Sequence, residues 1–157
     1  MKARLVLVLS AALLLAGSSA ALSAEGFPAK CAGTYLMAED GGATSLWTFG
    51  ADGTFFASSS LQPLLNFSDQ QGSWEQDGSR GAKGVVLALV FGDDNVLINV
   101  SRVDVSVHTV GNGCDRIAGS LVVREFTGGE DPLDPSTDTG GPIATDTFTG
   151  RRVKAIR

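Results

Sequence analysis

The chain has one histidine, and the polar residues that precede it are the first candidates for chemistry. Arg102, Asp104 and Ser106 stand at every second position before His108, the only imidazole in the sequence. A Ser-His-Asp site needs a carboxylate that orients the imidazole, but Asp104 is about 13 Å from His108 along an extended strand. An inward-facing stripe would suggest an isomerase or cyclase site. Burying its unpaired charges is costly, so we expect the stripe to face solvent.

Cys31 and Cys114 are the only cysteines of the chain. Without a Cys-x-x-Cys pattern, and with a single histidine, zinc binding and thioredoxin-type chemistry are disfavoured. If the two cysteines pair, they close a loop of more than eighty residues, for which chain entropy gives a stabilisation of about 4–5 kcal/mol. We expect this disulfide, with two free thiols as the alternative.

An acidic segment near the C-terminus offers oxygen ligands of the kind Ca²⁺ prefers, namely Glu130, Asp131, Asp134 and Asp138. Their spacing matches no EF-hand loop, so we expect a solvated acidic loop at 130–138. The sequence also lacks a Gly-x-Ser-x-Gly elbow and a phosphate-binding glycine loop. We therefore expect no cofactor, no metal site and a protein that is not an enzyme.

The N-terminus has the pattern of a secretory signal peptide. Lys2 and Arg4 precede an apolar run at 5–16, and small residues follow it. That run is short for a membrane span, which needs about 20 apolar residues; a retained membrane anchor is the alternative. The sequence does not choose between cleavage after Ala20, Ser23 or Ala24. The sequence thus predicts a secreted or periplasmic protein, and the Ala-rich signal is typical of bacteria.

Residues 25–157 are expected to form one domain, preceded by the signal peptide at 1–24. The 133 residues that remain are enough for a core of their own. Without the two basic residues of the signal, ten basic residues face seventeen acidic ones, a net charge of −7. A chain of this charge repels phosphate backbones, so we expect no nucleic-acid partner. We also expect no stable membrane span after signal cleavage.

Short β-branched and apolar segments, separated by Gly, Asn and Asp, predict an all-β fold. Pro63 prevents a regular strand at 61–68, where we expect a loop or one helical turn that caps an opening. Residues 128–143 are too rich in Gly, Pro and Asp for a strand or helix of any length. Sequential strands with short turns favour a closed, eight-stranded antiparallel up-and-down β-barrel. The expected strands are 32–39, 44–49, 54–60, 70–76, 84–91, 96–110, 113–126 and 145–156.

Alternation within these segments predicts which residues face the core. Val103, Val105 and Val107 share one face of their strand, while the stripe that ends at His108 shares the other. This period of two is the habit of antiparallel sheets with one packed and one solvated face. Earlier in the same strand the apolar residues change phase, which predicts a β-bulge near 99–102.

The first predicted strand begins with Gly33-Thr34-Tyr35, and the last contains Arg151 and Arg152. This arrangement resembles the calycins (lipocalins, fatty-acid-binding proteins and avidins), whose first strand carries Gly-x-Trp and whose last strand supplies a basic residue that packs over the ring. Tyr35 stands where calycins usually have Trp, and the other lipocalin motifs are absent. The resemblance implies a calycin-like barrel closed by Tyr35 with Arg151 or Arg152, through a cation–π contact of about 0.5–2 kcal/mol.

We expect the barrel to bind a small apolar molecule or to act as an interaction module. Segment 61–67 is the expected lid. A filled barrel with a structural role is one alternative, and an enzyme using the stripe around His108 is another. An apolar void above about 300 Å³ would favour ligand binding. The expected ligand-binding residues are Leu36, Trp47, Phe55, Leu64, Phe67, Trp74, Val105 and Leu121.

Overall fold

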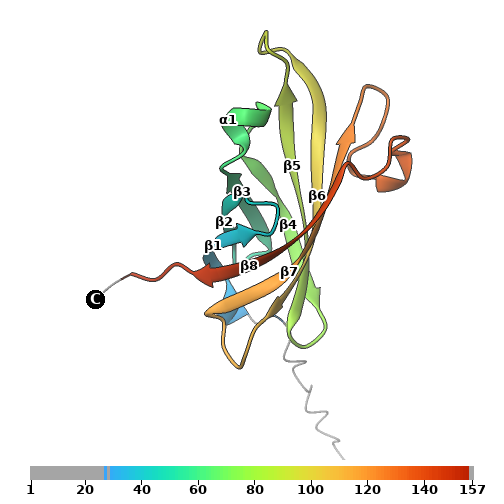
Figure 1. The fold of residues 1–157 in the computed structure, drawn as a ribbon. Coiled ribbons are helices and arrows are strands. Elements are labelled where there is room, and N and C mark those ends of the chain that lie inside the picture. Colours follow the sequence, from blue (N-terminus) through green and yellow to red (C-terminus); the bar gives the residue numbers. More distant parts are fainter. Residues whose placement is uncertain (1–26, 28, 156–157) are drawn as a thin grey trace, which may run out of the picture.

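A computed structural model of the chain describes Phe27 and residues 29–155. In this part of the chain, eight antiparallel strands follow one another and close into a barrel (Figure 1). The prediction of an all-β, eight-stranded up-and-down barrel is therefore confirmed. The strands are β1 (Gly33–Glu39), β2 (Thr44–Phe49), β3 (Thr54–Ser59), β4 (Gln70–Asp77), β5 (Gly81–Phe91), β6 (Leu97–Thr109), β7 (Arg116–Phe126) and β8 (Ala144–Arg152).

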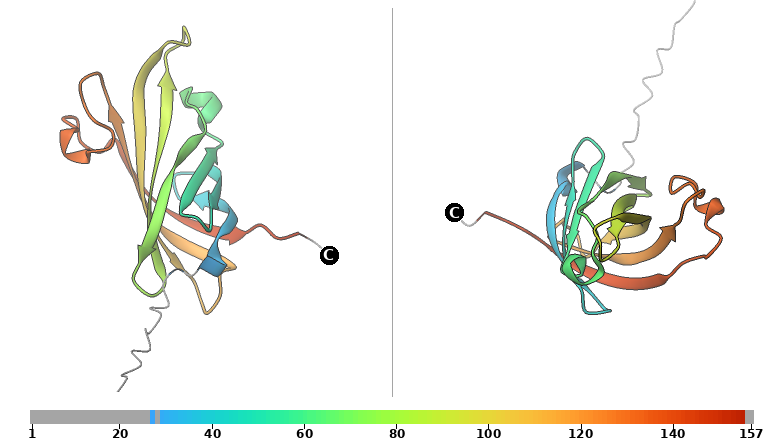
Figure 2. Two further views of the ribbon diagram at one scale, coloured as in Figure 1. Left: turned by 180° about the vertical axis from the view of Figure 1, so that it is seen from behind. Right: turned by 90° about the horizontal axis from the view of Figure 1, so that it is seen from above.

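Each strand pairs with the next in the sequence, and β8 returns to pair with β1, as the view from above in Figure 2 shows. Tight turns make this order possible. Between β2 and β3, Gly53 has a φ of 88°, a conformation that glycine adopts without strain. In the same turn, Asp52 Oδ1 accepts hydrogen bonds from Thr54 N at 3.1 Å and Thr54 Oγ1 at 2.7 Å. Closure pairs both edges of the sheet with each other.

Alternation along β6 separates the barrel interior from its outer wall. Val103, Val105 and Val107 are buried in the core, whereas Ser106 and His108 are exposed. The apolar face predicted for this strand is therefore confirmed. On the other face the expectation of solvent exposure is wrong for Arg102, which is 9% exposed because it contacts the carbonyl groups of Pro132 and Leu133. Inward positions of the other strands follow from their pairing with β6 and with one another.

The irregularity predicted in the sixth strand occurs earlier than expected. Consecutive residues of β5 pair with Asn99 and Leu97, which leaves Ile98 as the extra residue of a bulge. The predicted position was 99–102. Val96 and Ile98 are both more than half exposed, because this end of the β5–β6 hairpin rises beyond the rest of the barrel and has no interior to face (Figure 1).

A disulfide closes the lower end of the barrel, where β1 and β7 begin. Cys31, in the short 3-10 helix η1 (Ala29–Cys31), is bonded to Cys114 in the turn before β7, with 5.0 Å between the Cα atoms. The predicted pairing is confirmed, and the bridge spans β8, which both strands flank. A stable disulfide indicates an oxidising compartment. The predicted signal peptide at 1–24 lies outside the described residues.

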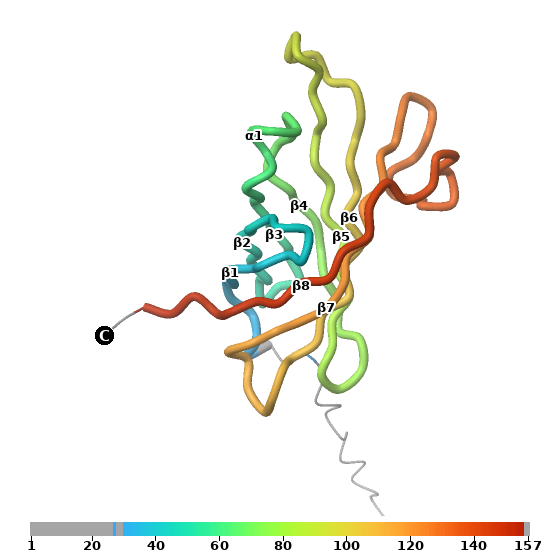
Figure 3. The backbone as a smooth tube through the Cα atoms, in the orientation of Figure 1, coloured from blue at the N-terminus to red at the C-terminus, as the bar shows by residue number. Residues whose placement is uncertain are grey.

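The upper end of the barrel carries the longer connections, which the tube in Figure 3 makes easy to follow. The helix α1 (Gln62–Leu65) joins β3 to β4, so of the two alternatives expected there, a loop or one helical turn, the structure has the helical turn. Residues 127–143 join β7 to β8 and contain the 3-10 helix η2 (Pro135–Thr137). This long loop extends outward beside β6 and β7 (Figures 1 and 2).

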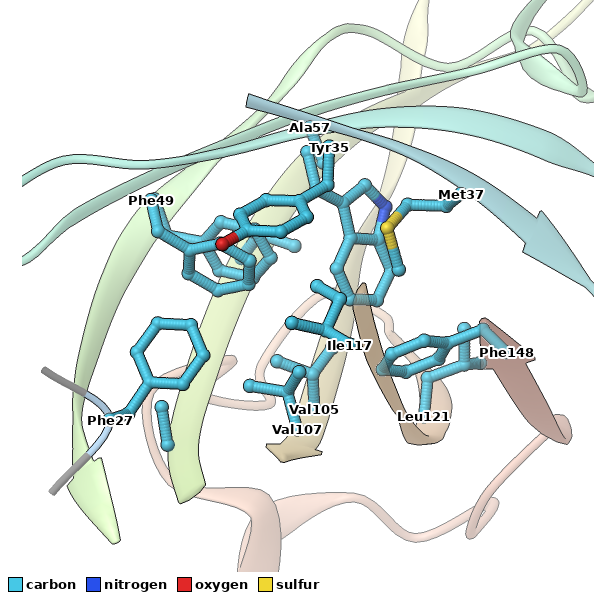
Figure 4. Close-up of a cluster of buried hydrophobic side chains, with 14 of the residues drawn as sticks. Phe27, Tyr35, Met37, Phe49, Ala57, Val105, Val107, Ile117, Leu121 and Phe148 are labelled. Atoms are coloured by element: carbon cyan, nitrogen blue, oxygen red, sulfur yellow. The ribbon is translucent and has the colours of Figure 1, made fainter. Parts of the chain in front are cut away.

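Aromatic side chains fill the lower and middle parts of the barrel (Figure 4). Phe49 stacks on Phe55 with ring centroids 4.6 Å apart, and Phe27 meets Phe49 edge to face at 5.6 Å. Trp47 meets Phe148 edge to face at 4.6 Å. Aromatic pairs of this kind contribute about 0.5–1.5 kcal/mol each beyond the area they bury. This cluster forms most of the packed core below the upper half of the barrel.

Candidate functional site

A cavity of about 140 Å³ lies in the upper half of the barrel, above the aromatic cluster. Its floor is apolar, because Trp47, Val103 and Leu121 belong both to the buried core and to the cavity wall. The cavity opens toward the end of the barrel that carries α1. The wall consists of Glu39, Ser45, Trp47, Ser59, Leu61, Leu65, Phe67, Gln70, Val90, Ser101, Val103, Leu121, Val123, Glu125 and Ile143.

The cavity exists because inward residues at this height are small. Ser45, Ser59 and Ser101 occupy wall positions on β2, β3 and β6. Trp47 is two residues from Ser45 on the same face of β2, toward the lower end of the barrel. Phe55 is four residues from Ser59 on β3, also toward the lower end. An eight-stranded barrel is just wide enough to fill itself with side chains or to hold one small ligand. Large residues below and small residues above therefore produce a cup with a closed floor.

The helix α1 covers part of the cavity, as a lid was expected to do. Leu61 and Leu65 line the cavity together with Phe67, which forms an isolated bridge with Val90 of β5. Leu64, on the other side of the helix, is 76% exposed. The segment thus presents one apolar side to the cavity and another to solvent.

Hydrogen bonds attach α1 to the barrel at both of its ends. At its start, Ser59 N donates to Gln62 Oε1 at 2.8 Å. At its end, Asn66 adopts the left-handed conformation with a φ of 50°, which Asn tolerates better than most residues. Its Nδ2 donates to the carbonyl oxygens of Phe91 at 3.1 Å and Gly92 at 2.9 Å. The lid is therefore anchored to the top of β5.

Two carboxylates lie in the cavity wall close to its mouth. Glu39 is the last residue of β1, and its Oε1 accepts a hydrogen bond from Ser45 Oγ at 2.6 Å. Glu125 stands next to the end of β7, and its Oε2 accepts from Asn99 Nδ2 at 3.2 Å. The cavity thus combines an apolar floor with a mouth rich in hydrogen-bond acceptors. Such a site can bind a molecule that has an apolar body and a donor group.

Three of the residues predicted to bind a ligand line this cavity, namely Trp47, Phe67 and Leu121. Phe55 and Val105 also face the interior, but they are buried in the filled core below. Direct contact with a ligand stays a prediction for all of these residues.

The structure does not bring the other three predicted residues to the cavity. Leu36 lies on the outer face of β1, and Leu64 lies on the exposed side of α1. Trp74 packs at the lower end of the barrel, where its Nε1 donates to the carbonyl oxygen of Gly50 at 2.8 Å. These three residues were predicted from their apolar character. That prediction did not consider which face of the strand or helix each side chain is on, or how far along the barrel axis it lies.

Several wall residues were missed because they are polar or small, among them Glu39, Ser45, Ser101 and Glu125. The alternation of inward and outward side chains along each strand could have identified these residues. Continuing the inward series of β6 from Val103 back by two residues reaches Ser101, and continuing that of β7 forward from Val123 reaches Glu125.

Tyr35 lies beside the disulfide at the lower end of the barrel. Its hydroxyl oxygen is 2.8 Å from the Cys31 carbonyl oxygen and 2.9 Å from that of Cys114, so its proton is donated to these two acceptors. Burial raises the pKa of the Tyr35 phenol above its usual value of 10.0, against the opposing charge of Arg152. The phenol therefore stays protonated and ties both cysteine segments to β1.

Arg152 is placed directly across from Tyr35 in the pairing of β1 with β8. Its guanidinium donates hydrogen bonds to the carbonyl oxygens of Lys30, at 2.8 Å, and Ala32. A Cβ atom at Gly33 would lie 3.0 Å from Arg152 Nη2, so glycine leaves room for the guanidinium. Arg151 is exposed on the outer wall. Stacking of either guanidinium on the tyrosine ring stays a prediction.

The stripe that ends at His108 lies on the outer wall of the barrel. Asp104 accepts hydrogen bonds from Arg102 Nε at 3.0 Å and Arg102 Nη2 at 2.7 Å. Its carboxylate therefore positions a guanidinium, while His108 is exposed four residues further along. The isomerase or cyclase alternative required an inward-facing stripe, and the geometry does not provide it.

The acidic loop at 127–143 is attached to the same outer wall. Arg102 Nη1 donates to the carbonyl oxygens of Pro132 at 2.9 Å and Leu133 at 3.1 Å. Arg124 forms an ion pair of 2.9 Å with Asp138, whose side chain is 1% exposed. The expected solvated loop is thus held against β6 and β7 by two arginines.

Within the loop, Glu130 makes the hydrogen bonds that hold distant residues of the loop together. Its carboxylate accepts hydrogen bonds from the backbone and hydroxyl groups of Thr139 and Thr127. These bonds lower the pKa of Glu130 from 4.5 to about 2. Among the described residues, no group of three or more His, Cys, Asp or Glu side chains converges as a metal site would require.

Comparison of the chain with protein-family models, curated proteins and solved structures finds no match. The role of the candidate site must therefore be argued from its own geometry, and the resemblance to calycins stays a prediction from the sequence. In the part of the chain that the structure describes, no helix has the length and apolar character needed to cross a membrane.

Proposed function

We propose that this protein binds one small molecule with an apolar body in the upper cavity and catalyses no reaction on it. The observation that carries the proposal is the apolar floor formed by Trp47, Val103 and Leu121 beneath a void of about 140 Å³. Ligand sites are typically concave and mostly apolar, with a few polar groups that orient the ligand. Glu39 and Glu125 would provide that orientation at the mouth.

The size of the cavity limits the ligand. Its 140 Å³ does not reach the void of about 300 Å³ that was expected to favour ligand binding, so the proposal is restricted to a very small ligand. A cavity of about 150 Å³ lined by apolar side chains binds benzene. The ligand is therefore about the size of a single ring, and an acyl chain or a steroid would not fit.

Binding takes place outside the reducing cytosol in this proposal. The disulfide between Cys31 and Cys114 supports an oxidising compartment, and the signal-peptide pattern at 1–24 supports export. A secreted or periplasmic binding protein satisfies both observations.

Fluorescence of Trp47 tests the proposal, because this indole forms part of the cavity floor. In a Trp74→Phe background, toluene should produce a saturable change in the emission of Trp47. Ser101→Phe places a large side chain in the cavity and should abolish the change. Ser106→Phe, on the exposed face of the same strand, should leave it intact. Absence of saturable binding in the parent, or equal binding by both phenylalanine variants, would reject the proposal.

A second candidate function, an interaction module, is favoured by apolar side chains exposed around the upper end of the barrel. Patches of this kind often mark contact sites. If the upper end is a contact site, Leu97→Lys should weaken the association between copies of the protein that sedimentation measures. Leu46→Lys, on the outer wall of β2, should not. Unchanged association in both variants would exclude this role for the rim. The exposed set is Leu64, Leu65, Leu89, Val96, Leu97, Ile98 and Ile143.

A further inference from the structure

The only charged side chains in the cavity wall are carboxylates, those of Glu39 and Glu125. They come from β1 and β7, the two strands that flank β8. Through Phe148 of β8, Glu39 is level with Gly119 of β7, six residues before Glu125, so the two carboxylates occupy separate places in the wall. All the other wall residues are apolar or neutral. The charge of the wall is therefore negative.

Both carboxylates have polar support from neighbouring strands. Ser45, 3% exposed, donates its hydroxyl proton to Glu39 at 2.6 Å, and Asn99 donates to Glu125 at 3.2 Å. A carboxylate has about four acceptor positions, so one neutral donor leaves capacity for more. Supported in this way, the two groups are positioned to accept hydrogen bonds from a ligand.

The basic residues nearest in sequence are already engaged elsewhere. Arg124, which precedes Glu125, points to the outer wall and pairs with Asp138 at 2.9 Å. Arg102, next to Ser101, pairs with Asp104 at 2.7 Å. None of the four ion pairs found among the described residues includes Glu39 or Glu125. Within the described part of the chain, a ligand that enters the cavity therefore meets two carboxylates that form no ion pair with a side chain.

This arrangement discriminates between ligand head groups. Any occupant displaces water from the two carboxylates, and taking a charge out of water is costly unless an opposite charge replaces the water. A ligand with a carboxylate would add repulsion between like charges. A hydrocarbon would offer no opposite charge, so the free-energy cost of removing water from Glu39 and Glu125 would remain. An ammonium group would offset it with charge-assisted hydrogen bonds, which are stronger than neutral ones.

Building on the proposed function, we infer that the cavity is selective for small organic amines that carry one ring or an equally small apolar body. The ring lies on the floor of Trp47 and Leu121, and the ammonium group donates to either Glu39 or Glu125 in the wall.

Three ligands of nearly equal shape separate this inference from apolar binding alone. Benzylamine, benzyl alcohol and toluene share a ring and differ in one terminal group. Binding is measured by Trp47 fluorescence in the Trp74→Phe protein at pH 7. Both benzylamine and benzyl alcohol can donate a hydrogen bond to a carboxylate, but only the ammonium group adds attraction between opposite charges, so benzylamine should bind at least about tenfold more tightly than benzyl alcohol. The preference should fall as salt is added.

Variants locate the effect at the two carboxylates. The double variant Glu39→Gln with Glu125→Gln should reduce the preference for benzylamine over benzyl alcohol to less than about threefold. Toluene should bind more tightly than in the parent, because its binding no longer takes two charges out of water. Glu75→Gln, an exposed change on β4, should keep the full preference. Each single variant is measured as well, so that loss of folding in the double variant does not obscure the result.

The outcomes distinguish the two proposals. If toluene and benzylamine bind equally well, or if the glutamine variants keep the full preference, the selectivity for amines is wrong while binding in the cavity stands. If none of the three ligands binds, the proposed function itself fails.

Discussion

Removing the disulfide should destabilise the barrel by an amount that the structure allows us to calculate. Cys31 and Cys114 are 83 positions apart, and a closed loop of that length reduces the entropy of the unfolded chain enough to stabilise the fold by about 4.5 kcal/mol. For a domain of this size, 1 kcal/mol corresponds to about 3–4 °C in Tm. The double variant Cys31→Ser with Cys114→Ser should therefore melt about 14–18 °C below the parent.

Thermal unfolding followed by circular dichroism measures this difference under oxidising conditions. The parent protein treated with a thiol reductant should melt close to the double variant, and the variant should not respond to the reductant. A fall of less than about 3 °C in both experiments would contradict the chain-entropy argument. It would mean that the unfolded chain keeps the two segments close together even without the bridge.

Three more changes test other parts of the structure. Val105→Asp places a charge in the packed interior and should cost about 4 kcal/mol or more, whereas Ser106→Asp on the outer wall should be tolerated; equal denaturation midpoints would refute the assignment of faces. Tyr35→Phe leaves two buried carbonyl oxygens without their donor and should cost about 1–3 kcal/mol in denaturant unfolding; no change would show that these bonds are not stabilising. Because the pKa of Glu130 is lowered in the fold from 4.5 to about 2, its contribution should be present above pH 4.5 and lost as the pH falls toward 2. The stability difference between the parent and Glu130→Gln should therefore shrink over that interval, and a difference independent of pH would contradict the assignment.

Much of the fold could be predicted because its determinants are local. Turn residues such as Asp52 and Gly53 mark where strands end, and a period of two in β6 identifies the packed face. The disulfide followed from the presence of only two cysteines together with a signal-peptide pattern. None of these predictions depended on residues that are distant in sequence, apart from the cysteines themselves.

The candidate site was harder to predict because it depends on how high each side chain sits in the barrel. Phe55 and Leu121 both face inward, but only Leu121 reaches the cavity. That difference follows from the stagger of neighbouring strands, which pairing decides. Alternation in β1 could have excluded Leu36, since it stands between the buried Tyr35 and Met37.

The attachment of the acidic loop was also beyond the reach of local pattern. Arg102 contacts carbonyl groups thirty residues away, and Arg124 pairs with Asp138 across most of the loop. Such partners depend on the path of the loop over the outer wall. Composition indicated only that the segment would be irregular, and it was.

The aromatic cluster in the lower barrel makes the two ends of the barrel different, because it closes only one of them. Phe27, Phe49 and the cysteine bridge block one end of the described barrel, so a guest cannot pass through it from end to end. In the proposed function, a ligand would therefore enter and leave at the same end of the barrel, beside α1. The proposal then implies that losing the hydrogen bonds from Asn66 to Phe91 and Gly92 would speed the release of the ligand without changing the cavity.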